Sequence, residues 1–260
     1  MDLSTIIGLI LGLIGLIGGF MLEGGHMGAL WGLSAFCIVL GGTMGATIIG
    51  MPFEQLKSIP KWFVIAFSNK SLDGETMYNT LVRFSEKARQ EGLLSLETDL
   101  DEVEDSFLRQ GMQLIIDGAD PDITRSILEA GQTVQESRHK VGIGFFEAAG
   151  GYSPTMGIIG TVMGLIHVLG NLSDADKLAS SIAAAFIATL YGVSFANVLF
   201  LPLASKLKIR DKTETHIKDM ILDGIISIQS GENPSILKEK LKTHLGFTPA
   251  EDKTAESQIR

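Results

Sequence analysis

Hydrophobic and polar positions are segregated along this chain. Four stretches of about twenty residues contain no Asp, Glu, Lys or Arg, and each is long enough to cross the hydrocarbon core of a bilayer. They are Ser4 to Leu22, Ala29 to Met51, Tyr152 to Asn171 and Ser180 to Ala204. The strongly charged sequence lies between or after them. The pattern predicts an all-α integral membrane protein with four transmembrane helices and large polar parts.

The polar segment between the second and third stretches has helical periodicity. Met77, Leu81, Phe84 and Ala88 fall near one helical face. A second helical pattern, SFLRQGMQLIIDGADPDITRSILEAGQ, is broken at DGADPD, where Asp120 can cap a helix that starts at Pro121. We predict a third helix from about Gly131 to Gly150 that leads directly into the third stretch.

The segment after the fourth stretch also predicts a helix. Apolar residues at Ile217, Ile221, Ile225 and Ile228 indicate that the fourth span continues as a long helix, which should stop at 231–234. A short helix and a disordered polar tail should follow. We therefore expect four parts: residues 1–51 with the first two spans, 52–151 as a helical loop domain, 152–204 with the last two spans, and 205–260 as a C-terminal helix and tail.

The distribution of lysine and arginine predicts the orientation, because these residues mark the cytoplasmic ends of spans. The two short links, EGGHMG and LSDADKLA, hold a single lysine, whereas SKLKIRDK after the fourth span holds four cations. Cations also flank the 52–151 segment, at Lys57, Lys61, Arg138 and Lys140. Both termini and the large loop should be cytoplasmic. A signal peptide at the N-terminus is disfavoured because Asp2 is acidic and no small-x-small cleavage site follows.

Composition narrows the classes of function. The net charge of −9 disfavours nucleic-acid binding. The single cysteine, Cys37, lies within the second span and cannot form an intrachain disulfide. The common catalytic and nucleotide-binding motifs are absent from the sequence, and its five histidines share no metal-ligand spacing. We expect no enzyme activity and no cofactor.

Small residues line the third and fourth spans. Gly157, Gly160 and Gly164 form a flat stripe on the third span, and the fourth span has its own small-residue face, which includes Ala185, Ala188, Gly192 and Ala196. Small residues let helix backbones approach closely in lipid. The two stripes favour helix packing, within one chain, between subunits or around a guest helix.

Thr161 and Thr189 are polar residues within these faces. A threonine in a membrane helix commonly bonds to the carbonyl four residues back, here Gly157 and Ala185, and that interpretation stands beside one in which the hydroxyls line an ion path. Pro154 and Pro202 can each mark a helix boundary or a kink. His167 is best explained as a polar residue near the membrane interface.

The spans contain no ionisable residue apart from His167, although such residues mark ion and proton pathways in membranes. Either the chain transports nothing, or a partner supplies an acid.

Several stretches resemble the MotA/PomA stator subunits of the bacterial flagellar motor, in the wider MotA/TolQ/ExbB channel superfamily. They are ARQEGLLSLE, GYSPTMGIIGTVMGLIHVLGNL, AAAFIATLYGVSFANVLFLPLASKL and DGIISIQSG. The number and order of the spans extend the resemblance over nearly the whole chain. TolQ and ExbB proteins generally have three spans, so four favour the flagellar branch.

The resemblance implies a mechanism in the bacterial inner membrane. Five such subunits form a homopentameric ring around two copies of a MotB/PomB-type partner, which has one span, is anchored to peptidoglycan and carries the ion-binding aspartate. Passage of H⁺ or Na⁺ is thought to rotate the ring, whose cytoplasmic loop turns the rotor protein FliG.

The resemblance also implies roles for individual residues. Arg89 and Glu97 match the charged pair proposed to contact FliG, although a solvated surface pair is the simpler interpretation of the residues alone. Pro154 and Pro202 match prolines tied to torque. Thr189 matches a pore-facing threonine, and Thr161 a position that is typically threonine in sodium-driven members. These matches favour sodium weakly.

Two alternatives remain open from the sequence. One is a TolQ/ExbB-like subunit that drives envelope transport. The other is a passive membrane scaffold whose acidic loop, with about seventeen carboxylates against ten lysines and arginines, docks a soluble partner.

Overall fold

A computed structural model describes residues 3–68, 72–170 and 175–245. These residues fall into two compact units, which are treated separately below. The membrane unit comprises Met1–Asn69 and His139–Ile209, and the polar unit comprises Lys70–Arg138 and Arg210–Arg260. Every regular element in the described ranges is helical, which confirms the predicted all-α fold.

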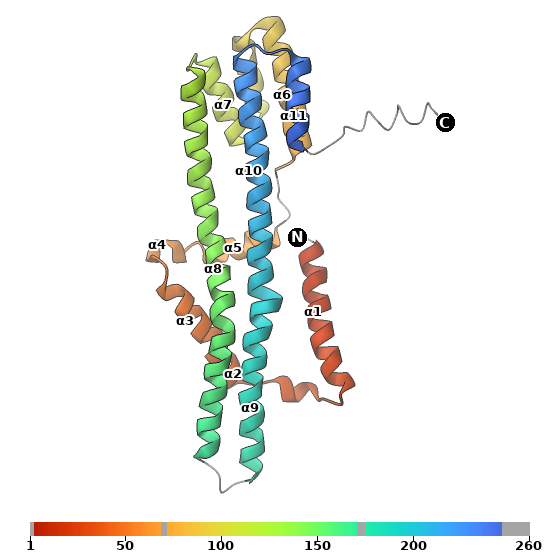
Figure 1. Ribbon diagram of the computed structural model, residues 1–260, viewed down its shortest axis with the longest axis vertical. Coiled ribbons are helices and arrows are strands. Elements are labelled where there is room, and N and C mark those ends of the chain that lie inside the picture. The colour runs from red at the N-terminus through yellow and green to blue at the C-terminus, as the bar shows by residue number, and fades with distance from the viewer. Residues whose placement is uncertain (1–2, 69–71, 171–174, 246–260) are drawn as a thin grey trace, which may run out of the picture. The chain divides into compact units, whose positions relative to one another are not determined.

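The membrane unit contains the apolar helices (Figure 1). Its elements are α1 (Leu3–Leu22), η1 (Met27–Leu30), α2 (Leu33–Phe36), η2 (Cys37–Gly41), α3 (Gly42–Ile49), α4 (Phe53–Leu56), α5 (Ile59–Phe67), the later part of α8 (Pro121–Leu169), α9 (Ala175–Ser194), η4 (Phe195–Phe200) and the start of α10 (Leu201–Gln229). Within the described ranges, four segments are long and apolar enough to cross a membrane: Leu3–Leu22, Met27–Ile49, Pro121–Leu169 and Ser181–Gln229. Each overlaps one of the four predicted spans, of which the end at Asn171 lies outside the described residues.

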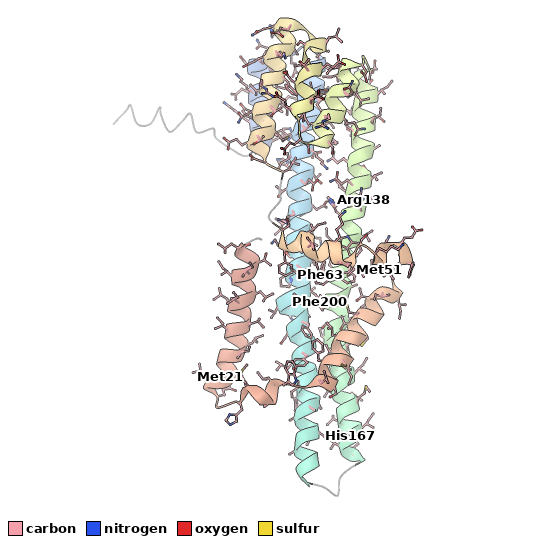
Figure 2. The ribbon with its side chains drawn as sticks, turned by 180° about the vertical axis from the view of Figure 1, so that it is seen from behind. Met21, Met51, Phe63, Arg138, His167 and Phe200 are labelled. Carbon is pink, nitrogen blue, oxygen red and sulfur yellow. The ribbon has the colours of Figure 1, made fainter. Side chains whose placement is uncertain are left out.

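Aromatic side chains form the core of this unit. Phe63 on α5 stacks edge-on against Phe145 and Phe146 on α8, with ring centroids 6.3 and 4.9 Å apart. Such edge-to-face pairs add to the stabilisation that burial alone gives. Phe200 belongs to the same cluster, and Figure 2 labels Phe63 and Phe200. One apolar cluster thus joins α5 to α8 and to η4.

The second span is less regular than the sequence predicts. The 3₁₀ turn η1 ends at Leu30, Trp31 and Gly32 have extended backbone, and α-helix begins only at Leu33. The π-helical segment η2 then widens the helix over Cys37–Gly41. The apolar run from Ala29 onward gave no sign of this break, because apolar composition is equally compatible with either backbone.

α8 is one continuous helix of 49 residues, so the prediction of a separate helix beginning near Gly131 is wrong. A lone glycine inside a helix lowers the stability of that helix by about 1 kcal/mol relative to alanine. This loss is too small to end a helix whose residues before and after the glycine are packed. The predicted break at DGADPD is confirmed: α7 ends at Ile116 and α8 begins at Pro121.

Pro154 and Pro202 do not mark helix ends. Pro154 lies inside α8. Pro202 is the second residue of α10, and helical backbone runs through Ser194 and Leu201 on either side of the π-helical segment η4. Pro202 has no N–H to donate to Val198, four residues earlier, and a proline beside a π segment is a recognised site of helix bending.

The polar unit is a helical domain with its own apolar core. It contains α6 (Gly74–Glu91), the 3₁₀ segment η3 (Leu93–Glu102), α7 (Ser106–Ile116), the start of α8, the rest of α10 and α11 (Pro234–Leu245). Leu81 and Phe84 on α6 are fully buried, and Met77 and Ala88 pack against the same core, as the periodicity predicts. The predicted continuation of the fourth span is confirmed by α10, which ends at Gln229 before Gly231 at φ +68°.

Carboxylates cap the helices of the polar unit. The side chain of Asp73 accepts from the Glu75 N–H, that of Asp105 accepts from Leu108 at 2.8 Å, and that of Asp120 accepts from Asp122 at 3.0 Å. Each satisfies an amide that has no partner within its own helix. The hydrogen bond from the Thr76 hydroxyl lowers the pKa of the Asp73 carboxyl below its ordinary value.

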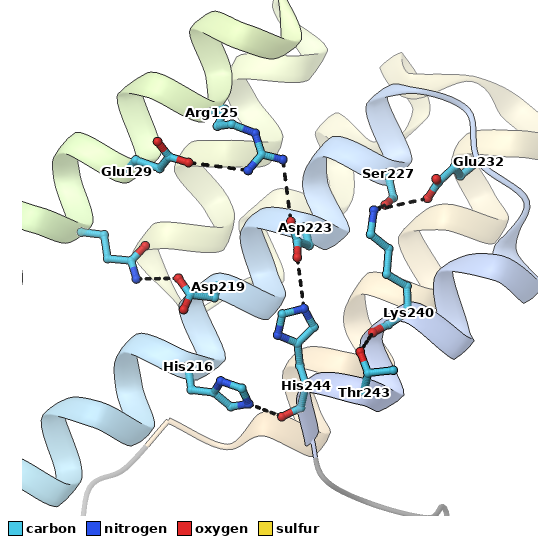
Figure 3. Close-up of polar contacts among 11 residues, drawn as sticks. Arg125, Glu129, His216, Asp219, Asp223, Ser227, Glu232, Lys240, Thr243 and His244 are labelled. Atoms are coloured by element: carbon cyan, nitrogen blue, oxygen red, sulfur yellow. Dashed lines mark hydrogen bonds and ion pairs between the residues drawn. The ribbon is translucent and has the colours of Figure 1, made fainter.

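Polar contacts tie α11 to α10 (Figure 3). His244 Nε2 lies 3.0 Å from Asp223 Oδ2, and Lys240 Nζ donates to the Ser227 hydroxyl at 2.9 Å. Arg125 brings α8 to the same carboxylate, with 3.7 Å between its guanidinium and Asp223 Oδ1. These contacts fix the C-terminal helix on the polar unit.

Lys218 is the most deeply buried cation in the described part of the polar unit, with a side chain 5% exposed. Its ammonium lies 3.0 Å from Glu214 and 5.5 Å from the centre of the Phe107 ring. It also donates to Gln135 Oε1. A buried charge is tolerated when it is paired and hydrogen-bonded in this way.

Candidate functional site: the contact of α8 and α9

α8 and α9 meet through glycines in the membrane unit, where Figure 1 shows them side by side. A Cβ built on Gly157 would lie 2.9 Å from the Ala188 carbonyl oxygen and 3.2 Å from the Cα of Gly192. A Cβ on Gly192 would lie 2.6 Å from the Ser153 carbonyl oxygen. Real Cβ atoms do not occupy such positions, so the two backbones are in direct contact.

The contact extends along α8 with a period of one helical turn. A Cβ on Gly160 would lie 2.7 Å from the Cβ of Ala188, and a Cβ on Gly164 would lie 2.8 Å from that of Ala185. Ala185 and Ala188 are 2% and 1% exposed. Five of the small residues that the sequence analysis assigns to packing therefore lie on one shared surface: Gly157, Gly160, Gly164, Ala185 and Gly192.

Thr161 lies in the middle of this surface and is half-buried. Its hydroxyl is 3.1 Å from the Gly157 carbonyl oxygen and 3.0 Å from that of Ala185 on the facing helix. It also contacts the Thr189 hydroxyl. The Thr161 hydroxyl thus makes the bond to the carbonyl four residues back that the sequence predicts, and it also contacts the facing helix.

The cluster has more acceptors than hydrogens. The two hydroxyls carry one hydrogen each, whereas four oxygens converge: Thr161 Oγ1, Thr189 Oγ1 and the Gly157 and Ala185 carbonyls. Lone pairs therefore remain without a hydrogen from the cluster, and the neighbouring side chains of both spans are apolar or small. The arrangement can attract a cation or a proton donor, and it lacks a carboxylate of its own.

One residue that the sequence analysis did not select supports this contact. The Ser153 hydroxyl is fully buried and donates to the Gly192 carbonyl at 2.9 Å. Ser153 precedes Pro154 and falls four residues before Gly157, so its position on the stripe was a usable signal.

The other predicted residues lie elsewhere. Arg89 is in the last turn of α6 and Glu97 is in η3, and both are exposed on the polar unit. His167 is exposed near the end of α8 (Figure 2). In the described residues, no group of three or more His, Cys, Asp or Glu side chains could hold a metal ion.

The fold and this site define a class: a multi-span, all-helical membrane protein in which glycines bring two spans into contact beside two hydroxyl groups. Residues 99–220 match the MotA/TolQ/ExbB proton channel family, and residues 6–92 match the motility protein A N-terminal family.

Full-length relatives give the same result. Motility protein A of Borreliella burgdorferi is 39% identical over 259 residues, which cover 100% of this chain and 99% of that protein. Chemotaxis protein PomA of Vibrio alginolyticus is 34% identical, over 94% of this chain and 96% of that protein. The solved flagellar MotAB stator complex from Bacillus subtilis contains a chain with a TM-score of 0.88 and 34% identity, covering 97% of this chain and 98% of that chain.

The chain therefore belongs to the MotA/TolQ/ExbB proton channel family, and within it to the motility protein A stator subunits of the flagellar motor. Proteins of this family are ion-channel subunits and not a known class of enzyme, and their apolar helices make them multi-pass proteins of the inner membrane.

Proposed function

We propose that this chain assembles with a single-span, MotB-type partner into an ion channel that converts ion flow into torque on FliG. The observation that carries the proposal is the oxygen cluster at Thr161. It brings hydroxyl and carbonyl oxygens together and has no acid, so it needs a carboxylate from outside the chain to bind a cation. The Bacillus subtilis structure to which this chain is similar is a complex of MotA with MotB, which supports such a partner.

Sodium is the coupling ion that we favour. Na⁺ is a hard cation that requires several oxygen ligands, and the two threonine hydroxyls, a backbone carbonyl and the partner's carboxylate would supply them. A proton would need only the carboxylate. Thr161 also stands where the family resemblance gives threonine in sodium-driven members.

In the proposed assembly, five copies of this chain surround two partner helices, with both termini and the 52–151 segment in the cytoplasm. The small-residue surface of α8 and α9 would hold the two spans at a fixed distance beside the partner. Pro154 and Pro202, each set within helical backbone, would allow these spans to bend as the ion passes. Arg89 and Glu97 would face the rotor from the polar unit.

The experiment that tests the coupling ion is swimming speed in a motile bacterium without its own stators, in which this chain and its partner are expressed. We expect speed to rise with external sodium at fixed pH and to survive a protonophore. If the speed does not depend on external sodium and is abolished by the protonophore, the coupling ion is the proton instead. Absence of swimming by an assembled complex in a cell with a matching rotor would count against the motor function and favour a scaffold.

The rotor contact is tested by charge reversal. We expect Arg89→Glu or Glu97→Lys to reduce swimming speed by about half or more while ion flux and assembly stay normal, because a charge at the rim of an interface contributes to docking rather than to folding. The matched control is Glu91→Lys, an exposed residue of the same region whose new lysine lies favourably near the C-terminus of α6. Equal effects of Glu97→Lys and Glu91→Lys would remove Glu97 from the contact.

A further inference from the structure

The break in the second span leaves backbone groups inside an apolar region. η1 ends at Leu30 and α2 begins at Leu33, with Trp31 at φ −93°, ψ 111° and Gly32 at φ −137°, ψ 98° between them. Lipid cannot satisfy the amides and carbonyls that such a break releases, so irregular backbone at membrane depth needs partners from the protein.

The hydroxyl of Tyr191, on α9, meets two of these groups. It accepts a hydrogen bond from the Gly32 N–H at 3.2 Å and donates to the Leu30 carbonyl. One hydroxyl can do both, since it carries one hydrogen and two lone pairs. The two bonds tie α9 to both sides of the break across about 160 residues of sequence.

The ring of Tyr191 is held separately from its hydroxyl. It packs edge-on against Phe36, with centroids 6.4 Å apart, and at a tilt against Phe195, 6.0 Å away. Loss of the hydroxyl alone would therefore leave the ring in its aromatic cluster, and the two contributions can be separated by experiment.

The opposite face of α9 carries the oxygen cluster. Residues 189 and 191 are about 200° apart around an α-helix, so Thr189 and Tyr191 point to opposite sides. Thr189 contacts Thr161 on α8, while Tyr191 contacts the second span. Ala188, between these faces, is 1% exposed and packs with Ala35 and Val39 of the second span.

We propose that Tyr191 is a positioning residue: its hydroxyl anchors α9 to the broken segment of the second span and thereby sets the rotation of α9 that brings Thr189 onto Thr161. The proposal deepens the proposed function and rests on the ion path at these two threonines. The glycine contacts of α8 fix the distance between α8 and α9, and the hydroxyl of Tyr191 adds the rotational restraint from the other side.

The first arm of the test measures geometry without ion transport. The pair Thr161→Cys and Thr189→Cys, in a Cys37→Ser chain coexpressed with its partner, is crosslinked by a mild oxidant in membranes. We expect Tyr191→Phe to slow the crosslink by about threefold or more, because two hydrogen bonds of modest net strength are lost. Tyr152→Phe, an exposed tyrosine of α8, is the matched control and should leave the rate unchanged. An unchanged rate in Tyr191→Phe would overturn the proposal.

The second arm measures swimming against the concentration of the coupling ion, in chains with native threonines. We expect Tyr191→Phe to raise the half-maximal ion concentration about threefold or more while the maximal speed and the amount of complex stay near those of Tyr152→Phe. A uniform loss of speed together with loss of complex would show a merely structural role and overturn the proposal. If the crosslink slows and the half-maximal concentration does not move, the positioning role stands and the ion path at Thr161 and Thr189 falls.

Discussion

We expect Gly157→Ala to abolish assembly of the stator and motility, whereas Gly151→Ala, six residues earlier on the same helix, preserves both. An alanine Cβ at residue 157 would lie 2.9 Å from the Ala188 carbonyl oxygen and 3.2 Å from the Cα atoms of Thr189 and Gly192. These are main-chain atoms of a helix, so no side chain can rotate to make room. A Cβ at residue 151 would meet nothing within 4 Å.

Overpacking in a close-packed interior typically destabilises a protein by about 1–3 kcal/mol. Because the contact at residue 157 is with rigid backbone, we expect Gly157→Ala to lie at the upper end of this range. The measurement is the amount and thermal stability of the complex purified with its partner, followed by swimming. Gly192→Ala should behave alike, since its Cβ would lie 2.6 Å from the Ser153 carbonyl oxygen. Normal assembly of Gly157→Ala would show that α8 and α9 are farther apart in the working complex.

The second large effect is expected at Thr161. Replacement by alanine removes the hydroxyl that reaches the Gly157 and Ala185 carbonyls, whereas replacement by serine keeps it. We expect Thr161→Ala to raise the sodium concentration for half-maximal swimming by about tenfold, which corresponds to the loss of one ligand worth about 1.4 kcal/mol, and Thr161→Ser to stay near the native value.

The control for this prediction is Thr155→Ala. Thr155 is an exposed threonine of the same helix whose hydroxyl bonds locally to the Tyr152 carbonyl at 2.7 Å. If Thr161→Ala and Thr155→Ala share one sodium dependence, Thr161 has only a packing role, and the ion path must lie elsewhere.

The parts of the fold that depend on local pattern could be predicted from the sequence. The four spans follow from uninterrupted apolar runs, and the buried face of α6 follows from the spacing of Leu81 and Phe84. The stripe of Gly157, Gly160 and Gly164 identified the contact surface, because glycine at a helical period has few other uses in a membrane helix. That α9 supplies the facing surface was one of the arrangements that the small residues left open, beside packing between subunits or around a guest helix.

The parts that depend on distant partners could not be predicted. At the break in the second span, the Gly32 N–H and the Leu30 carbonyl bond to the hydroxyl of Tyr191, about 160 residues away. The local sequence does not predict that pairing. The continuity of α8 through Gly131 is likewise a result of packing, which overrides the weak preference of one glycine. At Thr161, the bond to the Gly157 carbonyl follows from local spacing, whereas the bond to the Ala185 carbonyl depends on the facing helix.

The π-helical segment η4 has a consequence for how the length of this span can change during evolution. A π turn contains about one residue more than an α turn, so a π segment accommodates an insertion without rotating the helix on either side. Deletion of one residue within Phe195–Phe200 can therefore be absorbed by conversion of η4 to ordinary α-helix, with Ala188 and Leu203 keeping their buried directions. A deletion of one residue between Ala185 and Gly192 would instead turn the two parts of the small-residue face by about 100° relative to each other and separate one of them from α8. Insertions and deletions among relatives should accordingly concentrate at η4 and be absent from the glycine contact.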